Sequence, residues 1–242
     1  MNANTAVGAE TEVESVSSAP GRPSAVLFDI DGTLVDSNYL HVHAWCRAFA
    51  DTGIEVESWR VHRSIGMDGS RLIESLAAEA KEWQRDRATE LHAEYYKQMS
   101  PLLRLLPGAR DLLELVDSRK LQVVLATSAP EDELSILRAL LDSEDLFSAV
   151  TSSEDVDVAK PEPAIVEIAL KRAGVDASHA VFVGDTVWDA RASTTAGVTC
   201  IGVRSGGVSR EELENAGAAM VFDNPEDMVR RFDESPLGSL PR

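Results

Sequence analysis

The chain has 242 residues and a formal net charge of −18, so it is long enough for one domain with a large insertion and acidic enough to disfavour binding to nucleic acid or anionic membranes. Apolar residues at 44% and charged residues at 26% exclude wholesale disorder, and no uncharged apolar stretch approaches the ~18 residues of a membrane-spanning helix. Because the chain has only two cysteines and no signal-peptide pattern, we expect a soluble cytoplasmic protein, as a monomer or, alternatively, a dimer.

The first part of the chain combines a polar tail, a short strand and a long helical block. Residues 1–22 are rich in Ala, Ser, Glu, Thr and Gly and lack periodicity, which predicts a disordered tail. The apolar run Ala25–Phe28 predicts a strand, which the turn-forming residues Asp31 and Gly32 follow. In residues 37–104 the apolar side chains recur at helical spacing, which predicts a bundle of roughly four helices.

After Pro107 and Gly108 the pattern changes, and apolar strands alternate with helices. Strands are expected at Gln122–Thr127, near Ala149–Thr151, and at Ala180–Val183, Thr199–Val203 and Ala219–Phe222. Helices are expected at Ala109–Ser118, about Glu131–Leu141, Pro163–Ala173, Asp189–Ala196 and Arg210–Ala216. The alternation is typical of an α/β fold with a parallel sheet. The expected parts are therefore a core of residues 23–36 and 105–232, an inserted cap of residues 37–104, and a C-terminal tail of residues 233–242.

Two carboxylates follow the first predicted strand. Asp29 and Asp31 stand in front of Gly32, which lets the backbone turn and lets its N–H groups approach a ligand closely. Taken alone, the segment fits either a metal or phosphate site or a turn capped by its aspartates. A calcium-binding loop is excluded, because such a loop places its glycine at the sixth position after the first ligand.

Further polar groups follow the later strands. Thr127 and Ser128 can donate to an anionic oxygen, although such residues are also common helix caps. Lys160 precedes a proline and is either a surface charge or a phosphate ligand. Asp185 and Asp189 can share one site, but Asp185 or Thr186 could instead cap the following helix. Because parallel sheets bind ligands beyond the carboxyl ends of their strands, we expect these groups to converge. Carboxylates would then hold a hard cation, and the lysine and hydroxyl would offset phosphate charge.

In this order the motifs resemble those of the haloacid-dehalogenase-like (HAD) superfamily, whose members are mostly phosphatases. The resemblance covers roughly residues 25–232, and its four motifs are matched by Asp29–Ser37 (D-x-D-G-T-L-V-D-S), Thr127, Lys160-Pro161, and Gly184-Asp185 with Asp189. The inserted helices look like the C1 cap of the phosphoglycolate phosphatase and β-phosphoglucomutase branch. The resemblance implies a Rossmann-like parallel-sheet core with an inserted all-helical cap domain.

The resemblance also implies a Mg²⁺-dependent phosphatase that hydrolyses a small phosphomonoester, of the sugar phosphate or phosphoglycolate type, through an aspartyl phosphate. Asp29 would be the nucleophile, and Asp31 would protonate the leaving alcohol and then activate water. The phosphate-binding residues would be Gly32, Thr127, Ser128 and Lys160. The Mg²⁺ ligands would be the Asp29 side chain, the Asp31 carbonyl oxygen, Asp185 and, through water or from outside the inner ligand sphere, Asp189.

Other reactions of the superfamily fit less well. The acid at Asp31 together with Asp185 argues against halide displacement, and no cap lysine precedes Lys81, where phosphonate hydrolysis would need an earlier one. A phosphosugar mutase of the β-phosphoglucomutase type stays open. Cap residues that could grip a second phosphate, the sugar or the leaving group are His41, Arg63, Gly66 and Arg71.

Non-enzymatic readings are a catalytically inactive phosphate-binding regulatory protein and a receiver-type phosphoacceptor. The presence of nucleophile, acid/base, lysine and metal carboxylates argues against the first, and the helical insertion argues against the second. The expected partner is a small phosphorylated metabolite, since a cap over the site leaves little room for a phosphoprotein. We therefore expect an enzyme of the phosphoric monoester hydrolase class.

Overall fold

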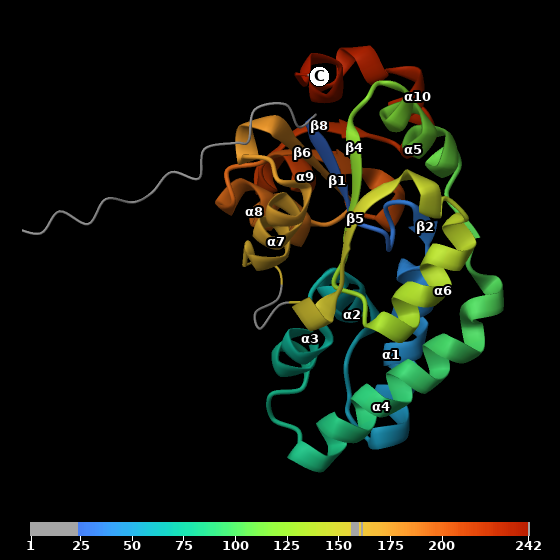
Figure 1. The fold of residues 1–242 in the computed structure, drawn as a ribbon. Coiled ribbons are helices and arrows are strands. Elements are labelled where there is room, and N and C mark those ends of the chain that lie inside the picture. The colour runs from blue at the N-terminus through green and yellow to red at the C-terminus, as the bar shows by residue number, and fades with distance from the viewer. Residues whose placement is uncertain (1–23, 156–159, 161, 242) are drawn as a thin grey trace, which may run out of the picture.

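The computed structural model describes residues 24–155, 160 and 162–241, so the tail expected at residues 1–22 lies outside the described residues. Its centre is a six-stranded sheet in the order β5-β4-β1-β6-β7-β8 (Figure 1). All neighbouring strands in it run parallel. The strands are β1 (Ala25–Phe28), β4 (Gln122–Ala126), β5 (Phe147–Thr151), β6 (Ala180–Gly184), β7 (Thr199–Val203) and β8 (Ala218–Phe222). The predicted α/β class is confirmed.

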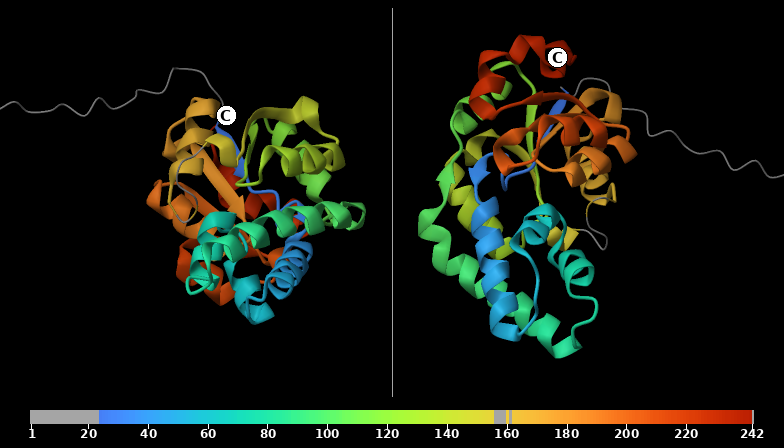
Figure 2. Two further views of the ribbon diagram at one scale, coloured as in Figure 1. Left: turned by 90° about the horizontal axis from the view of Figure 1, so that it is seen from below. Right: turned by 180° about the vertical axis from the view of Figure 1, so that it is seen from behind.

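Helices cover both faces of this sheet (Figures 1 and 2). Because strand side chains alternate between the faces, Val26 and Phe28 join one apolar cluster while Ala25 and Leu27 join the other. The first cluster includes α5 (Ala109–Ser118), α6 (Glu131–Leu141) and α10 (Pro225–Arg230), and the second includes α7 (Ala164–Ala173) and α8 (Val187–Thr195). Helix α9 (Arg210–Ala216) packs on β8 through Leu213. Burial on both faces explains the continuous apolar runs of the central strands.

The inserted segment, residues 37–104, contains four α-helices, the number expected for it. These are α1 (Asn38–Thr52), α2 (Ser58–Ser64), α3 (Gly69–Leu76) and α4 (Glu82–Met99). Trp45 and Phe49 on α1 and Leu91 and Tyr96 on α4 are buried in the apolar cluster that continues into the core. In Figure 1 these helices lie below the sheet, beyond the carboxyl ends of its strands. We call them the cap.

A two-stranded antiparallel ribbon marks both junctions between cap and core. β2 (Val35–Asp36) pairs with β3 (Arg104–Leu105), so that Val35 lies opposite Leu105 and Asp36 opposite Arg104. The Leu106 N–H also donates to the Leu34 carbonyl oxygen at 2.9 Å. The two crossings of the chain are therefore held side by side.

The C-terminal residues differ from the sequence expectation. Residues 233–242 were expected to form a tail, but Phe232–Glu234 and Pro236–Ser239 form short 3₁₀ helices. Leu237 is only 2% exposed and joins the main apolar cluster, and the Ser24 hydroxyl donates to the Pro241 carbonyl oxygen at 2.6 Å. Leu237 and the partly buried Leu240 pack on the core, and two leucines in a short segment are too sparse a pattern to predict this packing from sequence. None of the described helices is long and apolar enough to cross a membrane.

Candidate active site

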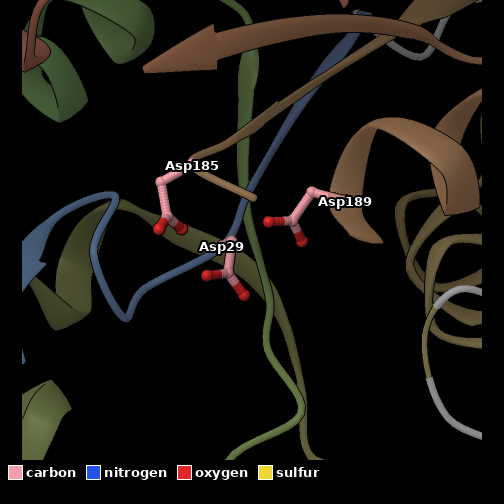
Figure 3. Close-up of side chains that lie close together, drawn as sticks. All are labelled: Asp29, Asp185 and Asp189. Atoms are coloured by element: carbon pink, nitrogen blue, oxygen red, sulfur yellow. The ribbon is translucent and has the colours of Figure 1, made fainter. Parts of the chain in front are cut away.

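Three aspartates meet at the carboxyl ends of β1 and β6. Asp29 follows β1, Asp185 follows β6, and Asp189 lies in the first turn of α8. Figure 3 shows their carboxylates turned toward one another. One oxygen from each lies within 4.8 Å of the others, and all three side chains are buried. The convergence that the strand-end positions predicted is therefore present.

Lys160 lies between two of these carboxylates. Its Nζ donates a hydrogen bond to Asp29 Oδ1 at 2.7 Å and forms an ion pair with Asp189 Oδ1 at the same distance. The side chain is 2% exposed. Burial alone would lower the pKa of the lysine, but Asp189 and Asp29 outweigh burial and raise it, so the ammonium stays charged. Lys160 is thus a buried cation at the site, as the phosphate-binding prediction requires.

Asp29 and Asp185 are buried carboxylates with raised pKa values. For Asp29 burial raises the pKa, Lys160 opposes this, and the charges of Asp189 and Asp31 add to it. For Asp185 burial and the charges of Asp189 and Asp29 raise the pKa well above its ordinary value. Three carboxylates share one buried lysine at this point, so additional positive charge would stabilise their ionised forms.

Neighbouring side chains hold Asp185 in place. The Asn38 amide donates to Asp185 Oδ2 at 2.7 Å, and the Thr33 hydroxyl donates to Asp185 Oδ1 at 3.2 Å. The backbone is also packed closely here: a Cβ on Gly32, whose φ is +70°, would lie 2.4 Å from Asp185 Oδ2. Gly32 is therefore needed both for its left-handed backbone and for the close approach of this carboxylate.

This donor set fits a divalent cation with hard oxygen ligands. Asp29, Asp185 and Asp189 each offer a carboxylate oxygen, and Mg²⁺ prefers such ligands. The Asp31 side chain is not part of this cluster, because its Oδ1 is engaged by Ser37 and His41. That placement agrees with the expectation that Asp31 would serve a metal through its carbonyl oxygen and keep its carboxyl group for other work.

The Asp31 carboxyl group faces the cap. The Ser37 hydroxyl donates to Asp31 Oδ1 at 2.5 Å, and His41 Nε2 lies 3.5 Å from the same oxygen. Burial would raise the pKa of Asp31, but the hydrogen bond and charge of His41 and the Ser37 hydroxyl bring it below its ordinary value. Asp31 in turn raises the pKa of His41 against the effect of burial. His41 therefore lies at the site from the cap side.

A second histidine supports the first, and the sequence analysis missed it. His92 Nε2 lies 3.1 Å from His41 Nδ1, and burial together with the charge of His41 lowers its pKa well below the ordinary value. A neutral His92 can accept a hydrogen bond from the His41 Nδ1–H, which leaves the His41 Nε2–H facing Asp31. The rings of Tyr96 and Trp45 stack on His41 and His92 at centroid distances of 3.9 and 4.2 Å. The i, i+4 spacing of His92 and Tyr96 on α4 was the available signal.

A cavity of about 320 Å³ lies between the strand ends and the cap. Asp29, Asp31, Thr127, Ser128 and Lys160 line it from the core side. Thr127 accepts a hydrogen bond from the Ala129 N–H at 3.1 Å, while the buried Ser128 hydroxyl has no partner among the described residues. An anionic ligand in the cavity would give that hydroxyl an acceptor.

Two of the four cap residues expected to contact the substrate lie on the cap side of the cavity. His41 and Gly66 line the cavity. Gly66 has φ +91°, and a Cβ there would lie 2.7 Å from the Thr186 side chain, so glycine lets this cap loop touch the core. Trp45, Ile65 and Leu72 add apolar surface to the same wall.

The other two expected cap residues, Arg63 and Arg71, are not among the described residues that line the cavity. Arg63 forms an ion pair with Glu212 on α9, and Arg71 lies 3.6 Å from Glu162. Both side chains are at the surface, 44% and 36% exposed. Each therefore bridges cap and core beside the cavity instead of reaching into it.

Glu133 was not identified from the sequence. It lies on α6, lines the cavity and is only 9% exposed. Burial raises its pKa to about 7, with His41 opposing and Asp31 adding to the shift. Its position three residues after Pro130, in a run of acidic residues at the helix start, looked like ordinary helix capping.

The structure is thus a parallel α/β core with carboxylates and a lysine at its strand ends, covered by a cap of inserted helices. A family model described as haloacid dehalogenase-like hydrolase matches residues 23–197. The chain belongs to this family, and the predicted hydrolase class is confirmed. The crystal structure of a hydrolase from Pseudomonas syringae superposes with a TM-score of 0.82 at 35% identity, covering 87% of this chain and 98% of that one.

Curated relatives match along most of the chain. A phosphorylated carbohydrates phosphatase from Thermotoga maritima is 30% identical over 213 residues, 87% of this chain and 98% of the relative. A phosphoglycolate phosphatase from Pseudomonas savastanoi pv. phaseolicola is 28% identical over 222 residues, 86% of this chain and 79% of the relative. The chain also matches SUPPRESSOR OF QUENCHING 1 of Arabidopsis thaliana at 29% identity, but covers only 23% of that protein.

Proposed function

We propose that this hydrolase is a Mg²⁺-dependent phosphatase that cleaves a small phosphomonoester through an aspartyl-phosphate intermediate. The observation that carries the proposal is the convergence of Asp29, Lys160 and the three-carboxylate cluster on one cavity under the cap. Phosphoryl transfer needs mainly alignment and charge neutralisation, and these groups supply both. The phosphatase names of the two relatives that match most of both chains support the same reaction class.

Asp29 is the proposed nucleophile. Lys160 Nζ holds its Oδ1 at 2.7 Å, which fixes the carboxylate and reduces its repulsion of an incoming phosphate. As the bond from Asp29 to phosphorus forms, the bond from phosphorus to the leaving alcohol oxygen breaks. Thr127, the unpartnered Ser128 hydroxyl and backbone N–H groups near Gly32 are the proposed neutral ligands of the phosphoryl oxygens.

Asp31 is the proposed acid and base. It lies at the cavity, outside the carboxylate cluster, and Ser37 and His41 orient it. In the first half-reaction Asp31, which must first take up a proton because His41 and Ser37 keep its pKa low, gives that proton to the leaving alcohol oxygen. In the second it takes a proton from the water that attacks phosphorus, as the bond between phosphorus and Asp29 breaks. His41 and His92 act through Asp31 and are positioning residues.

Asp29, Asp185, Asp189 and the Asp31 carbonyl oxygen are the proposed metal-binding groups. Mg²⁺ bound there would neutralise charge on the phosphoryl oxygens and align the phosphate with Asp29. Asn38 and Thr33 keep Asp185 aimed at this point. Small phosphate esters of the sugar phosphate or phosphoglycolate type fit the size of the cavity, which is about 320 Å³.

Hydrolysis of p-nitrophenyl phosphate tests the mechanism. The wild type should turn over with Mg²⁺, lose activity after chelation and regain it on add-back. Asp29→Asn should be inactive, because an amide is not a nucleophile here. In Asp31→Asn, water attack lacks its base while this activated leaving group needs little protonation, so phosphate should accumulate on the peptide that contains Asp29. Asp36→Asn, at an exposed carboxylate seven residues from Asp29, is the matched control.

Acid-quenched mass spectrometry would detect the added phosphoryl group in Asp31→Asn. Steady turnover by Asp29→Asn, with wild-type contamination and deamidation excluded, would overturn the nucleophile assignment. Full turnover after exhaustive metal removal would overturn the proposed metal dependence.

A further inference from the structure

The part of the cavity available to the leaving group is poor in positive charge. Among the described residues that line the cavity, Lys160 is the one lysine or arginine, and both its close contacts are with carboxylates of the proposed catalytic centre. Residues 156–159 and 161, which the structure does not describe, contain no lysine or arginine in the sequence. A second anionic group on the substrate would therefore find no lysine or arginine of its own.

The two arginines that could have supplied one are engaged elsewhere. Arg63 pairs with Glu212 and Arg71 with Glu162, and neither lines the cavity. His92 lines the cavity, but its burial and the charge of the neighbouring His41 lower its pKa and so favour its neutral form. His41 faces Asp31. The cap therefore covers the cavity but does not supply the positive charges that recognition of a second anion requires.

Acidic groups occupy this part of the cavity instead. Glu133 lines it and is 9% exposed, and its carboxyl group forms no hydrogen bond or ion pair with any described residue. Asp68 at the start of α3 also lines it, with its Oδ1 accepting from the Ser70 N–H. An unpartnered carboxyl group on so buried a residue is costly unless a ligand or water satisfies it. Glu133 can thus accept a hydrogen bond from a ligand that occupies the cavity.

We infer that the substrate is a phosphomonoester whose leaving group is uncharged and hydroxylated, with no second anion, and that Glu133 accepts a hydrogen bond from one of its hydroxyl groups. The inference rests on the proposed phosphatase function and narrows it. Apolar wall residues such as Ile65, Met67 and Leu72 contact the carbon skeleton. A carboxylate or second phosphate on the leaving group would instead approach Glu133 and Asp68 without compensation, so phosphoglycolate and sugar bisphosphates are poor substrates.

Glycerol 3-phosphate and 3-phosphoglycerate make the test sharp, because they differ by a CH₂OH group against a carboxylate. For the wild type with Mg²⁺ we expect kcat/KM for glycerol 3-phosphate to exceed that for 3-phosphoglycerate by at least ~10-fold, about the effect of one unpaired charge in a buried site. Glu133→Gln keeps an acceptor but removes the charge. It should therefore raise kcat/KM for 3-phosphoglycerate and reduce the preference for glycerol 3-phosphate over 3-phosphoglycerate. Glu133→Leu removes the acceptor, and should lower kcat/KM for glycerol 3-phosphate by ~10-fold or more.

The control variant is Glu131→Gln, which changes an exposed carboxylate on the same helix and should leave both values unchanged. Calorimetric binding of the two esters to the Asp29→Asn protein with Mg²⁺ should show the same order without turnover. Equal or better use of 3-phosphoglycerate by a wild type that hydrolyses p-nitrophenyl phosphate would overturn this inference and leave the phosphatase function standing. Wild-type specificity in both Glu133 variants would overturn the role of Glu133. Failure to hydrolyse any phosphomonoester would overturn both proposals.

Discussion

Replacing Gly206 with alanine tests whether Asp185 helps to hold the metal. Gly206 follows β7 in a short 3₁₀ turn, and its carbonyl oxygen accepts from Asn38 and His62 of the cap. A Cβ at this position would lie 1.6 Å from Asp185 Oδ2 and 2.6 Å from the Asn38 amide nitrogen. The added methyl group would therefore collide with the carboxylate and with the side chain that orients it.

The size of the collision sets the expected effect. Real Cβ atoms essentially never approach another heavy atom closer than 3.0 Å, so the Asp185 oxygen and the new Cβ must move apart by about 1.4 Å. Mg²⁺ demands oxygen ligands at about 2.0–2.1 Å in near-ideal octahedral geometry, and a displaced ligand of this kind no longer fits. We expect Mg²⁺ affinity to fall by about 10–100-fold, the range seen when groups that orient metal ligands are removed.

Isothermal titration with Mg²⁺ measures the affinity directly, and the Mg²⁺ dependence of p-nitrophenyl phosphate hydrolysis measures it through turnover. Gly69→Ala is the matched control for metal binding, because a Cβ there meets its nearest neighbour, Trp45, at an ordinary 3.7 Å. A folded Gly206→Ala protein, judged by its thermal unfolding, that binds Mg²⁺ as tightly as the wild type would refute the placement of the metal at Asp185.

Three further predictions concern stability and metal choice. Leu237→Ala should lower the free energy of unfolding by about 2–5 kcal/mol in urea titrations, since Leu237 is 2% exposed; an unchanged midpoint would mean that the C-terminal segment is not packed. Glu133 titrates at about 7 in the folded chain against an ordinary 4.5, so its contribution to stability is full below pH 4.5 and is lost as the pH rises through 7. In metal-free buffer the free energy of unfolding of Glu133→Gln, relative to that of the wild type, should therefore rise between pH 5 and 8, by up to about 3 kcal/mol. A difference in unfolding free energy that does not change with pH would contradict the burial of the Glu133 carboxyl group. Calcium should inhibit turnover, because its looser and higher coordination would misalign Asp29; activation by calcium would count against this geometry.

The core of the site could be predicted from sequence because parallel strands place their carboxyl ends at one edge of the sheet. Asp29 and Asp185 directly follow such ends and Asp189 lies four residues further on, so the convergence of the three needed only the strand pattern. Lys160 lies nine residues after the end of β5, so its place at the site came from the motif resemblance. Strand and helix bounds were also close, although α8 begins at Val187, two residues before the expected start. The Thr186 hydroxyl accepts from the Asp189 N–H, and the Asp189 carboxylate accepts from the Thr186 N–H. This capping box starts the helix within the same motif that supplies Asp185 and Asp189.

The cap side could not be predicted in the same way. A helix pattern shows which residues share a face, but not how the helix is rotated toward a neighbour from another part of the chain. Arg63 therefore turned out to face Glu212 on α9, and Arg71 to lie beside Glu162. Glu133 was hidden for a related reason, because its burial depends on the cap that covers α6 and not on its own segment.

The ribbon of β2 and β3 has a consequence for how this architecture can change over generations. Since Val35 pairs with Leu105 and Asp36 with Arg104, the inserted segment leaves and re-enters the core at a single hydrogen-bonded point. The order and direction of the core strands do not depend on what lies between those pairs. Inserted segments of other lengths can replace the cap at this ribbon without changing the order of the core strands. The part of the site that contacts the leaving group can therefore vary while the catalytic residues of the core stay the same.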